Sequence, residues 1–106
     1  MQKSIFIEVF GDYPQIRVLD FLIENDIFDY SKTQIAELSG VSFNTLETFW
    51  DRLIKNEILK ETRKVGNSQM YQLNKETPFV KSLMDIDKKL MLKSIKETET
   101  EIEILA

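Results

Sequence analysis

Apolar residues recur at helical spacing along most of the chain, and the residues that interrupt this pattern mark the ends of its elements. The apolar stretch from Ile5 to Phe10 is short, and its pattern fits either a helix or a strand. Pro14 suits the first turn of the next helix, because that position needs no backbone N–H. This helix is predicted to end near Asn25, and residues 27–30 then form a connector with room for a short strand.

The segment from Ser31 to Lys55 predicts two helices joined by a tight turn. Ser31 and Gln34 fit a capping box, in which each side chain bonds the backbone N–H of the other residue. Gly40 ends the first helix, where a left-handed residue is favoured, and Ser42 caps the second. The predicted buried positions are Ile35, Ala36 and Leu38 on the first helix, Val41 in the turn, and Leu46, Phe49, Trp50, Leu53 and Ile54 on the second.

Two short alternating runs follow the second helix, at about residues 58–64 and 69–73. The residues between them include Gly66 and Asn67, which tolerate the positive φ that a tight hairpin turn needs. These runs therefore predict one β-hairpin in a chain that is otherwise mostly helical.

A long helix is predicted to close the chain. Thr77 can cap it, with Pro78 in its first turn, and its apolar positions continue for about five turns. Residues 97–103 alternate Glu with Thr or Ile and are predicted to fray. The length of 106 residues indicates one compact domain, in which residues 1–76 form the main body and residues 77–106 a C-terminal helix and tail.

Composition excludes most catalytic chemistry. The chain has no Cys and no His, so it has no disulfide, no thiol or imidazole catalysis and no common zinc site. It also shows no nucleophile–base pair, no phosphate-cradling glycine loop and no cluster of metal ligands, which predicts a protein without enzymatic activity, metal or cofactor. Neither a membrane span nor a secretory signal is recognisable, which predicts a cytoplasmic protein. The remaining class is a binding protein.

The net charge of −4 is unevenly distributed. Residues 1–30 and 76–106 are acidic overall, whereas residues 31–75 carry seven cations and five acids. Four of these cations fall within the segment Lys55–Lys64. A local basic patch of this kind can attract phosphate although the whole chain is acidic.

The predicted order of elements is that of a winged helix-turn-helix domain with an extended C-terminal helix. Residues 32–64, KTQIAELSGVSFNTLETFWDRLIKNEILKETRK, resemble the DNA-binding core of MarR/ArsR-type regulators, with its pattern I-A-x-x-x-G-[VI]-S. The whole chain is most similar to small archaeal regulators of this kind. It departs from the pattern at Glu57, where the family usually has a Gly before the wing. The positions that match are Ile35, Ala36, Gly40, Val41, Ser42, Leu46 and Leu53.

The outer face of the second predicted helix suits the major groove of DNA. Asn44 and Arg52 have the bidentate geometry that reads base edges, and Ser42 lies at a helix N-terminus, where backbone N–H groups can bind phosphate. With the resemblance, this predicts a double-stranded DNA partner, a recognition helix at about 43–55 in the major groove and a wing at about 58–73 on the backbone or in the minor groove. The predicted contacts are Lys32, Thr33, Ser42, Asn44, Thr45, Thr48, Arg52, Lys55, Lys60, Arg63, Lys64, Asn67, Ser68 and Gln69.

The apolar face of the C-terminal helix predicts a homodimer. A chain with about four helices offers little core to cover so long a helix, and monomers rarely leave a large apolar patch in water. The alternative is that this face packs on the protein's own N-terminal helix. The predicted interface residues are Phe79, Leu83, Ile86, Leu90, Met91 and Ile95.

The same residues also allow plainer interpretations. The polar side chains of the second helix can simply be solvated, and Glu47 and Asp51 beside them oppose phosphate. Phe49 and Trp50 could stack on bases, but their spacing favours the core. The alternative function is a winged-helix protein–protein interaction module of a transcription or chromosome-segregation assembly, which the acidic net charge favours. The sequence indicates neither an operator nor a small-molecule effector.

Overall fold

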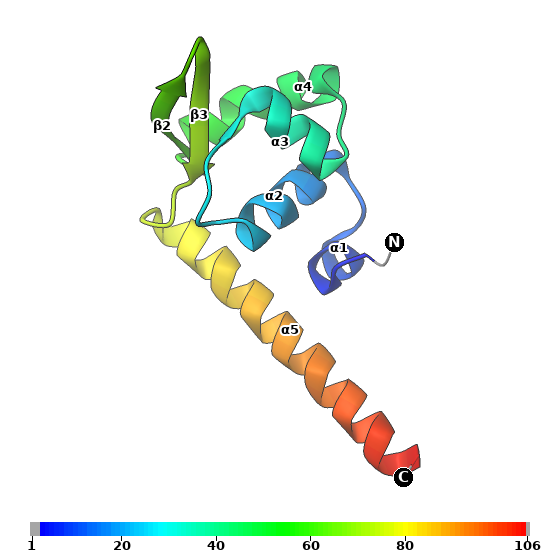
Figure 1. The fold of residues 1–106 in the computed structure, drawn as a ribbon. Coiled ribbons are helices and arrows are strands. Elements are labelled where there is room, and N and C mark those ends of the chain that lie inside the picture. The colour runs from blue at the N-terminus through cyan, green and yellow to red at the C-terminus, as the bar shows by residue number, and fades with distance from the viewer. Residues whose placement is uncertain (1–2, 106) are drawn as a thin grey trace.

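The computed structural model describes residues 3–105 and has a mostly helical fold with a small antiparallel sheet (Figure 1). The sheet has the strand order β1-β3-β2, and the long last helix leaves the body of the molecule at the end opposite the hairpin. This is a winged-helix fold, as the sequence predicts. The elements are α1 (Ile5–Phe10), α2 (Pro14–Glu24), β1 (Tyr30–Ser31), α3 (Lys32–Ser39), α4 (Phe43–Lys55), β2 (Leu59–Val65), β3 (Ser68–Leu73) and α5 (Pro78–Leu105).

Polar caps set the starts of the helices. Ser4 accepts a hydrogen bond from the backbone N–H of Ile7, which makes the ambiguous first segment a helix. The predicted capping box is confirmed, because the Ser31 N–H donates to Gln34 Oε1 over 2.8 Å and the Gln34 N–H donates to Ser31 Oγ over 3.2 Å. Gly40 ends α3 with a φ of 73°, the left-handed conformation expected there.

One hydrophobic core joins all the helices. Its fully buried members include Val18 from α2, Ile35 from α3, Leu46 from α4 and Val80 from α5. Phe49 and Trp50 are buried too, so they pack in the core and do not form a stacking platform.

Two of the predicted core positions are wrong. Leu38 is 57% exposed because it lines an open cleft beside Arg17 at the end of the short helix α3. Ile54 lies in the last turn of α4 and is 37% exposed, since the neighbouring Leu53 makes the contact with the core. Both residues lie near the end of a helix, where helical periodicity continues but packing does not.

The hairpin turn is tighter than the sequence pattern indicates. β2 and β3 each extend one residue further toward the turn than predicted, which leaves only Gly66 and Asn67 between them. Gly66 takes a φ of 60°. The register shifts between Glu61 and Lys64, so β2 contains an extra residue and bulges before the tip of the wing.

Glu57 occupies the left-handed position at the exit of α4 where the resembled family usually has Gly. Its φ is 55°, and it is the one residue other than glycine with positive φ within residues 3–105. Its carbonyl accepts a hydrogen bond of 2.7 Å from Thr77 Oγ1, which ties the exit of α4 to the start of α5. The backbone at Glu57 therefore takes the left-handed conformation that a Gly would adopt without steric cost.

Replacing Glu57 with Gly is expected to raise the free energy of unfolding by up to about 1 kcal/mol. The left-handed conformation costs a residue with a side chain about 1–2 kcal/mol, and the greater freedom of an unfolded Gly offsets about 0.5–1 kcal/mol of the gain. Urea unfolding measures the difference. Asn56→Gly is the control, because Asn56 has a φ of −89° and should only lose stability. A less stable Glu57→Gly protein would contradict this explanation.

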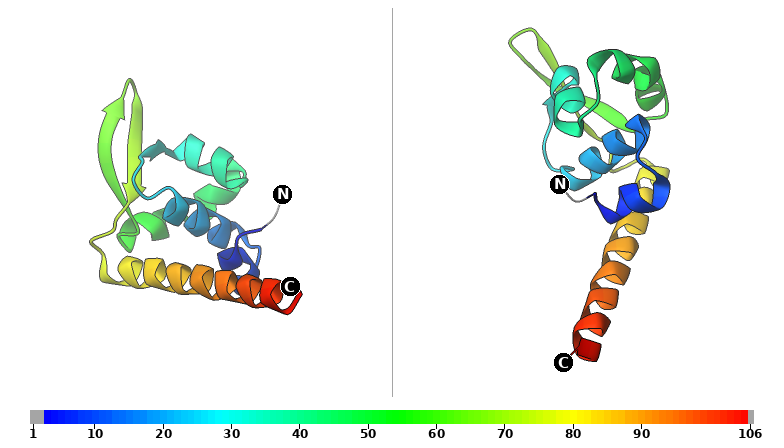
Figure 2. Two further views of the ribbon diagram at one scale, coloured as in Figure 1. Left: turned by 60° about the horizontal axis from the view of Figure 1, so that its bottom comes forward. Right: turned by 90° about the vertical axis from the view of Figure 1, so that its right-hand side faces the viewer.

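Helix α5 is longer and more regular than predicted. It spans 28 residues through Leu105, a length of about 42 Å, so the expectation that residues 97–103 fray is wrong. Its first half packs against the core and against α1, and its second half projects past α1 into solvent (Figure 2). Within residues 3–105, no helix is both long and apolar enough to cross a membrane.

Three carboxylates lie at the junction of α2 and α5. Asp20 and Asp87 are 8% and 9% exposed, and Ser4 Oγ donates a 2.8 Å hydrogen bond to Asp20. Burial raises the pKa of both carboxyls, and the charge of Asp20 raises the pKa of Asp87 further. Burial and these two acids also raise the pKa of Glu24. The charged forms of these carboxylates therefore destabilise the packing of α5 against the body of the protein.

Lowering the pH through the raised pKa of Asp87 should stabilise the fold. Between the ordinary and the raised pKa the folded state binds more protons than the unfolded state, so stability falls as pH rises through that window. Asp87→Asn should increase the melting temperature at neutral pH, and this gain should shrink as the pH is lowered. Asp85→Asn is the control, because Asp85 lies two residues earlier on α5 and is exposed. A pH-independent effect of Asp87→Asn would contradict the assignment.

Candidate nucleic-acid interface

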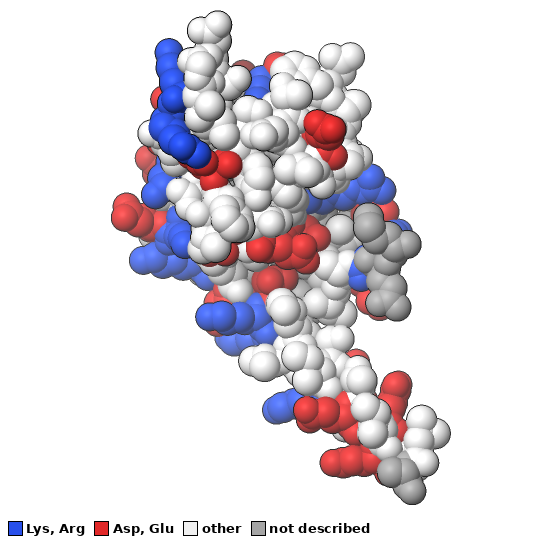
Figure 3. Space-filling view, in the orientation of Figure 1, with Lys and Arg blue, Asp and Glu red and all other residues white. Residues whose placement is uncertain are grey.

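Helices α3 and α4 and the tip of the hairpin lie together at one end of the molecule, far from the free end of α5 (Figure 1). All fourteen residues that the sequence predicts as DNA contacts lie on α3, on α4 or its N-cap, or on the hairpin of β2 and β3. Lys and Arg side chains line the outer edge of the hairpin on the face shown in Figure 3. The fold thus places the predicted recognition helix and wing on one side.

The outer face of α4 presents polar groups at helical spacing. Asn44, Thr48, Arg52 and Lys55 are all exposed. Within the described chain the side chains of Asn44, Arg52 and Lys55 make no hydrogen bond or ion pair, so they are available to a ligand. Thr48 differs, because its hydroxyl donates to the carbonyl of Thr45 over 2.6 Å.

Lys32 is engaged inside the helix-turn-helix unit. Its ammonium pairs with the Glu47 carboxylate and lies over the rings of Phe43 and Trp50, 5.3 and 4.9 Å from their centroids. The lysine is therefore a contact between α3 and α4 and is less accessible than predicted. The same contact neutralises one of the two acids on α4 that would oppose phosphate, and Asp51 remains. Thr33, one residue along α3, is exposed.

The start of α4 is fixed by two contacts, one of which the sequence does not reveal. Ser42 accepts from the Thr45 N–H over 3.1 Å and donates to Thr45 Oγ1 over 2.8 Å, so both hydroxyls serve the cap. Arg17 of α2 donates to the Gly40 carbonyl over 3.1 Å and pairs with Asp12. Arg17, and after it Lys3, hold the pKa of Asp12 well below its usual range. No local pattern predicts that α2 anchors this turn.

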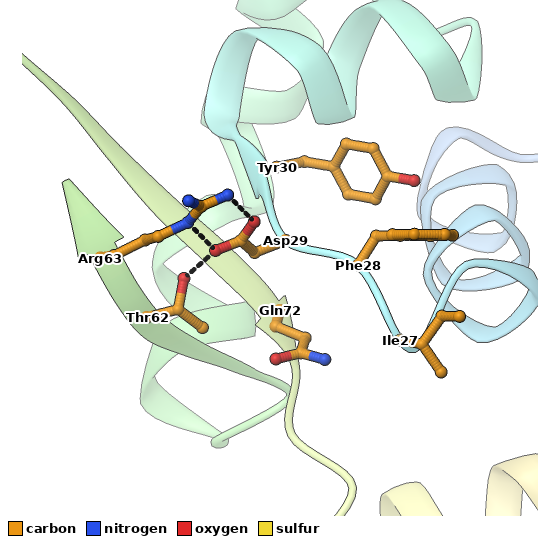
Figure 4. A pocket seen from close by; sticks show the side chains of 7 residues that line it. All are labelled: Ile27, Phe28, Asp29, Tyr30, Thr62, Arg63 and Gln72. Atoms are coloured by element: carbon orange, nitrogen blue, oxygen red, sulfur yellow. Dashed lines mark hydrogen bonds and ion pairs between the residues drawn. The ribbon is translucent and has the colours of Figure 1, made fainter. Parts of the chain in front are cut away.

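Asp29 holds the bulged part of the wing against the body of the protein (Figure 4). It accepts from Thr62 Oγ1 over 2.6 Å and from Arg63 Nε and Nη2 over 2.9 and 3.2 Å. Hydrogen bonds from Arg63 and then Thr62 lower the pKa of Asp29. Gln69 Nε2 donates to the Arg63 carbonyl over 3.2 Å. Two predicted DNA contacts, Arg63 and Gln69, therefore already have partners within the protein.

The remaining predicted wing residues are accessible. Lys60 and Lys64 are exposed and make no ion pair within residues 3–105, and Asn67 and Ser68 are exposed at the tip. The same part of the chain contains no group of three or more Asp and Glu side chains that could hold a metal ion. The free groups of the site thus include two amides and four cations, which suit a polyanion.

The predicted dimer residues divide between two environments. Leu83 and Leu90 are half-buried against the protein's own core, so the alternative of intramolecular packing holds for these two. Phe79, Ile86, Met91 and Ile95 are exposed. At 100° per residue, Phe79 and Ile86 point away from the side that carries Met91 and Ile95, so the six residues do not form one stripe.

Solved structures support the fold. No protein-family model and no curated protein sequence matches the chain. The antimony-specific transcriptional repressor AntR has a TM-score of 0.58 and 20% identity, covering 87% of this chain and 78% of its own. MepR, a transcription regulator of the Staphylococcus aureus multidrug efflux pump MepA, has a TM-score of 0.62 and 12% identity over 93% and 78%. Sso10a-2, a DNA-binding protein from Sulfolobus solfataricus, has a TM-score of 0.51 and 13% identity over 85% and 94%.

Replacing Asp29 with Asn should release Arg63 toward DNA. We expect tighter DNA binding at low salt and a steeper salt dependence, by about 0.9 in the log–log slope for each phosphate that Arg63 newly contacts. Asp26→Asn is the control, since Asp26 pairs with Lys75 and its replacement changes the net charge equally. Fluorescence anisotropy measures both slopes, and equal effects of the two variants would contradict the role of Asp29.

Proposed function

We propose that this protein is a sequence-specific regulator of transcription that binds double-stranded DNA as a homodimer. The observation that carries the proposal is the set of unpartnered groups at one end of the fold. Asn44, Arg52 and Lys55 line the outer face of α4, and Lys60 and Lys64 line β2. An amide with cations on the exposed face of a helix suits a major groove, and flanking cations suit the phosphates beside it.

Each part of the site has a separate task in this proposal. Helix α4 enters the major groove, where Asn44 reads adenine and Arg52 reads guanine or contacts phosphate. Lys60 and Lys64 contact the backbone sequence-independently. Ser42 and Arg17 position α4, and the ion pair with Lys32 neutralises the charge of Glu47.

The exposed part of α5 supplies the dimer contact. Two-fold pairing points two copies of α4 the same way, so the operator is expected to be pseudo-palindromic. Its half-sites should lie about 34–36 Å apart, or a multiple of that spacing. The transcription regulators AntR and MepR and the DNA-binding protein Sso10a-2 are similar to this chain in fold. Their similarity supports the proposal that this chain also binds DNA.

A protein-interaction module is the second candidate. Ile27 and Phe28 are exposed next to the wing, in the cleft that Asp29 and Arg63 also line (Figure 4). Together with the net charge of −4, this surface favours a protein ligand. On this alternative, a partner protein would cover the cleft and duplex DNA would not bind.

Selection of duplexes from a random pool, followed by footprinting, tests the proposal. The result expected is enrichment of one pseudo-palindromic sequence, with protection of two major-groove segments on the same side of the duplex. Ile27→Ser/Phe28→Ser should leave this binding unchanged. Recovery of a random pool, or of no DNA, would contradict sequence-specific recognition.

A further inference from the structure

The projecting half of α5 carries a regular apolar seam. Its residues alternate in spacing by four and three positions, which keeps them on one side of the helix, as in a coiled coil. The four large ones are between 49% and 86% exposed. The seam consists of Met91, Ile95, Thr98, Ile102 and Leu105.

This seam continues the side of α5 that covers the core. Val80 and Met84 pack on the core, and by helical periodicity they lie above Met91 and Ile95 on the same side of the helix. The helix then runs past α1, so the same side becomes bare. The apolar side of α5 is thus uncovered from the point where the helix passes the end of the protein's own body.

The charges of the projecting half are divided sharply along its axis. Residues 88–96 carry four lysines and no acid, whereas residues 97–105 carry four glutamates and no cation. The boundary lies between Lys96 and Glu97. Acidic side chains accordingly crowd the free end of the helix in Figure 3.

We propose that the occupant of this seam is the α5 helix of a second copy of this chain, and that the two helices run antiparallel. A two-fold axis at the boundary between Lys96 and Glu97 lays each acidic segment over the basic segment of the other copy. It also places Ile102 of one copy against Met91 of the other. A parallel pair would instead set four glutamates against four glutamates and four lysines against four lysines, which is repulsive at both ends.

The surface of α1 supports the antiparallel direction independently. Val9 and Phe10 are exposed on α1, which packs against α5. In an antiparallel pair the apolar end of the partner's helix returns toward this patch, so Leu105 arrives beside it. In a parallel pair both free ends lie away from α1, and the patch stays in water.

The inference rests on the proposed use of α5 as the dimer contact, but not on DNA binding. Its test contains no DNA, so its failure leaves the proposed DNA site untouched, and a failure to bind DNA leaves the pairing of α5 untouched. The antiparallel arrangement sets how far apart the two copies of α4 lie, and thereby the spacing of the half-sites.

Disulfide trapping in this cysteine-free chain tests the direction of pairing. We compare Met91→Cys alone, Ile102→Cys alone and an equal mixture of the two under mild oxidation. In the antiparallel pair two copies of position 102 are about 16 Å apart along the axis, beyond the roughly 7 Å that a disulfide spans between Cα atoms. Position 102 faces position 91, so only the mixture should yield a covalent dimer. Thr100→Cys, on the opposite side of the helix, controls for random collision.

Each result of this experiment decides the proposal. Covalent dimers of the mixture alone support it. Covalent dimers of Met91→Cys alone and of Ile102→Cys alone show parallel pairing and overturn it. Equal trapping of Thr100→Cys overturns it too, as does sedimentation of the unaltered protein as a monomer at its highest soluble concentration.

A charge-exchanged protein gives a second measurement. Its four lysines in residues 88–96 become Glu and its four glutamates in residues 97–105 become Lys. Antiparallel pairing predicts that it dimerises with itself and does not mix with the unaltered protein. Parallel pairing predicts the reverse, a preference for the mixed dimer. Native mass spectrometry of the two chains, distinguished by their masses, separates these outcomes.

Discussion

Replacing Ile95 and Ile102 with Glu is expected to dissociate the proposed dimer and to weaken binding to a two-half-site duplex by at least about 100-fold. Both side chains are more than half exposed, so their replacement should change the stability of the folded monomer little. The dimer loses its seam and gains four charges. The two DNA-binding surfaces then bind independently, and linked sites typically gain a factor of about 10²–10⁴ over single ones.

Ultracentrifugation, circular dichroism and anisotropy on one preparation measure this effect. Thr100→Glu/Ile104→Glu is the matched control, because it adds the same number of charges to the projecting half of α5, on the side away from the seam. The account requires that the control stay dimeric and bind DNA normally. A dimeric Ile95→Glu/Ile102→Glu protein would show that α5 is not the contact.

Replacing Asn44 with Ala is expected to cost about 1–3 kcal/mol on the preferred duplex and little on unrelated DNA. Asn44 is exposed in the first turn of α4 and has no partner within residues 3–105, so its loss leaves the fold intact. Loss of a base contact therefore reduces the difference in affinity between the preferred duplex and unrelated duplexes.

Asn67→Ala at the tip of the wing is the control for this change. The substitution is chemically identical, but a wing residue on the backbone should affect all sequences alike. Competition titrations with the two duplexes give the specificity ratio directly. If Asn44→Ala leaves that ratio unchanged, Asn44 does not read a base.

Local signals predict most of the fold because each acts over a few residues. Ser31, Gly40 and Ser42 set helix ends through their own hydrogen bonds or φ, and Gly66 sets the hairpin turn. Burial near helix ends is harder to predict, as Leu38 shows, because it depends on which element happens to cover the residue.

The candidate site is only partly predictable for the same reason. Sequence identifies Lys32 and Arg63 as cations, but their acidic partners lie on other elements, and only the folded chain brings Glu47 and Asp29 to them. The sequence does not identify Arg17 as part of the site, because its contact with the turn after α3 spans 23 residues. By contrast, the exposed cations of α4 and β2 that make no ion pair within residues 3–105, Arg52, Lys55, Lys60 and Lys64, are all among the contacts that the sequence predicts.

A salt titration of DNA binding tests the central claim most directly. If Arg52, Lys55, Lys60 and Lys64 of both copies contact phosphates, log affinity should fall linearly with log salt between about 50 and 200 mM, with a slope of about −7. Lys60→Ala/Lys64→Ala should halve this slope on preferred and unrelated duplexes alike. Binding that is absent, or that does not change with salt, would contradict the account.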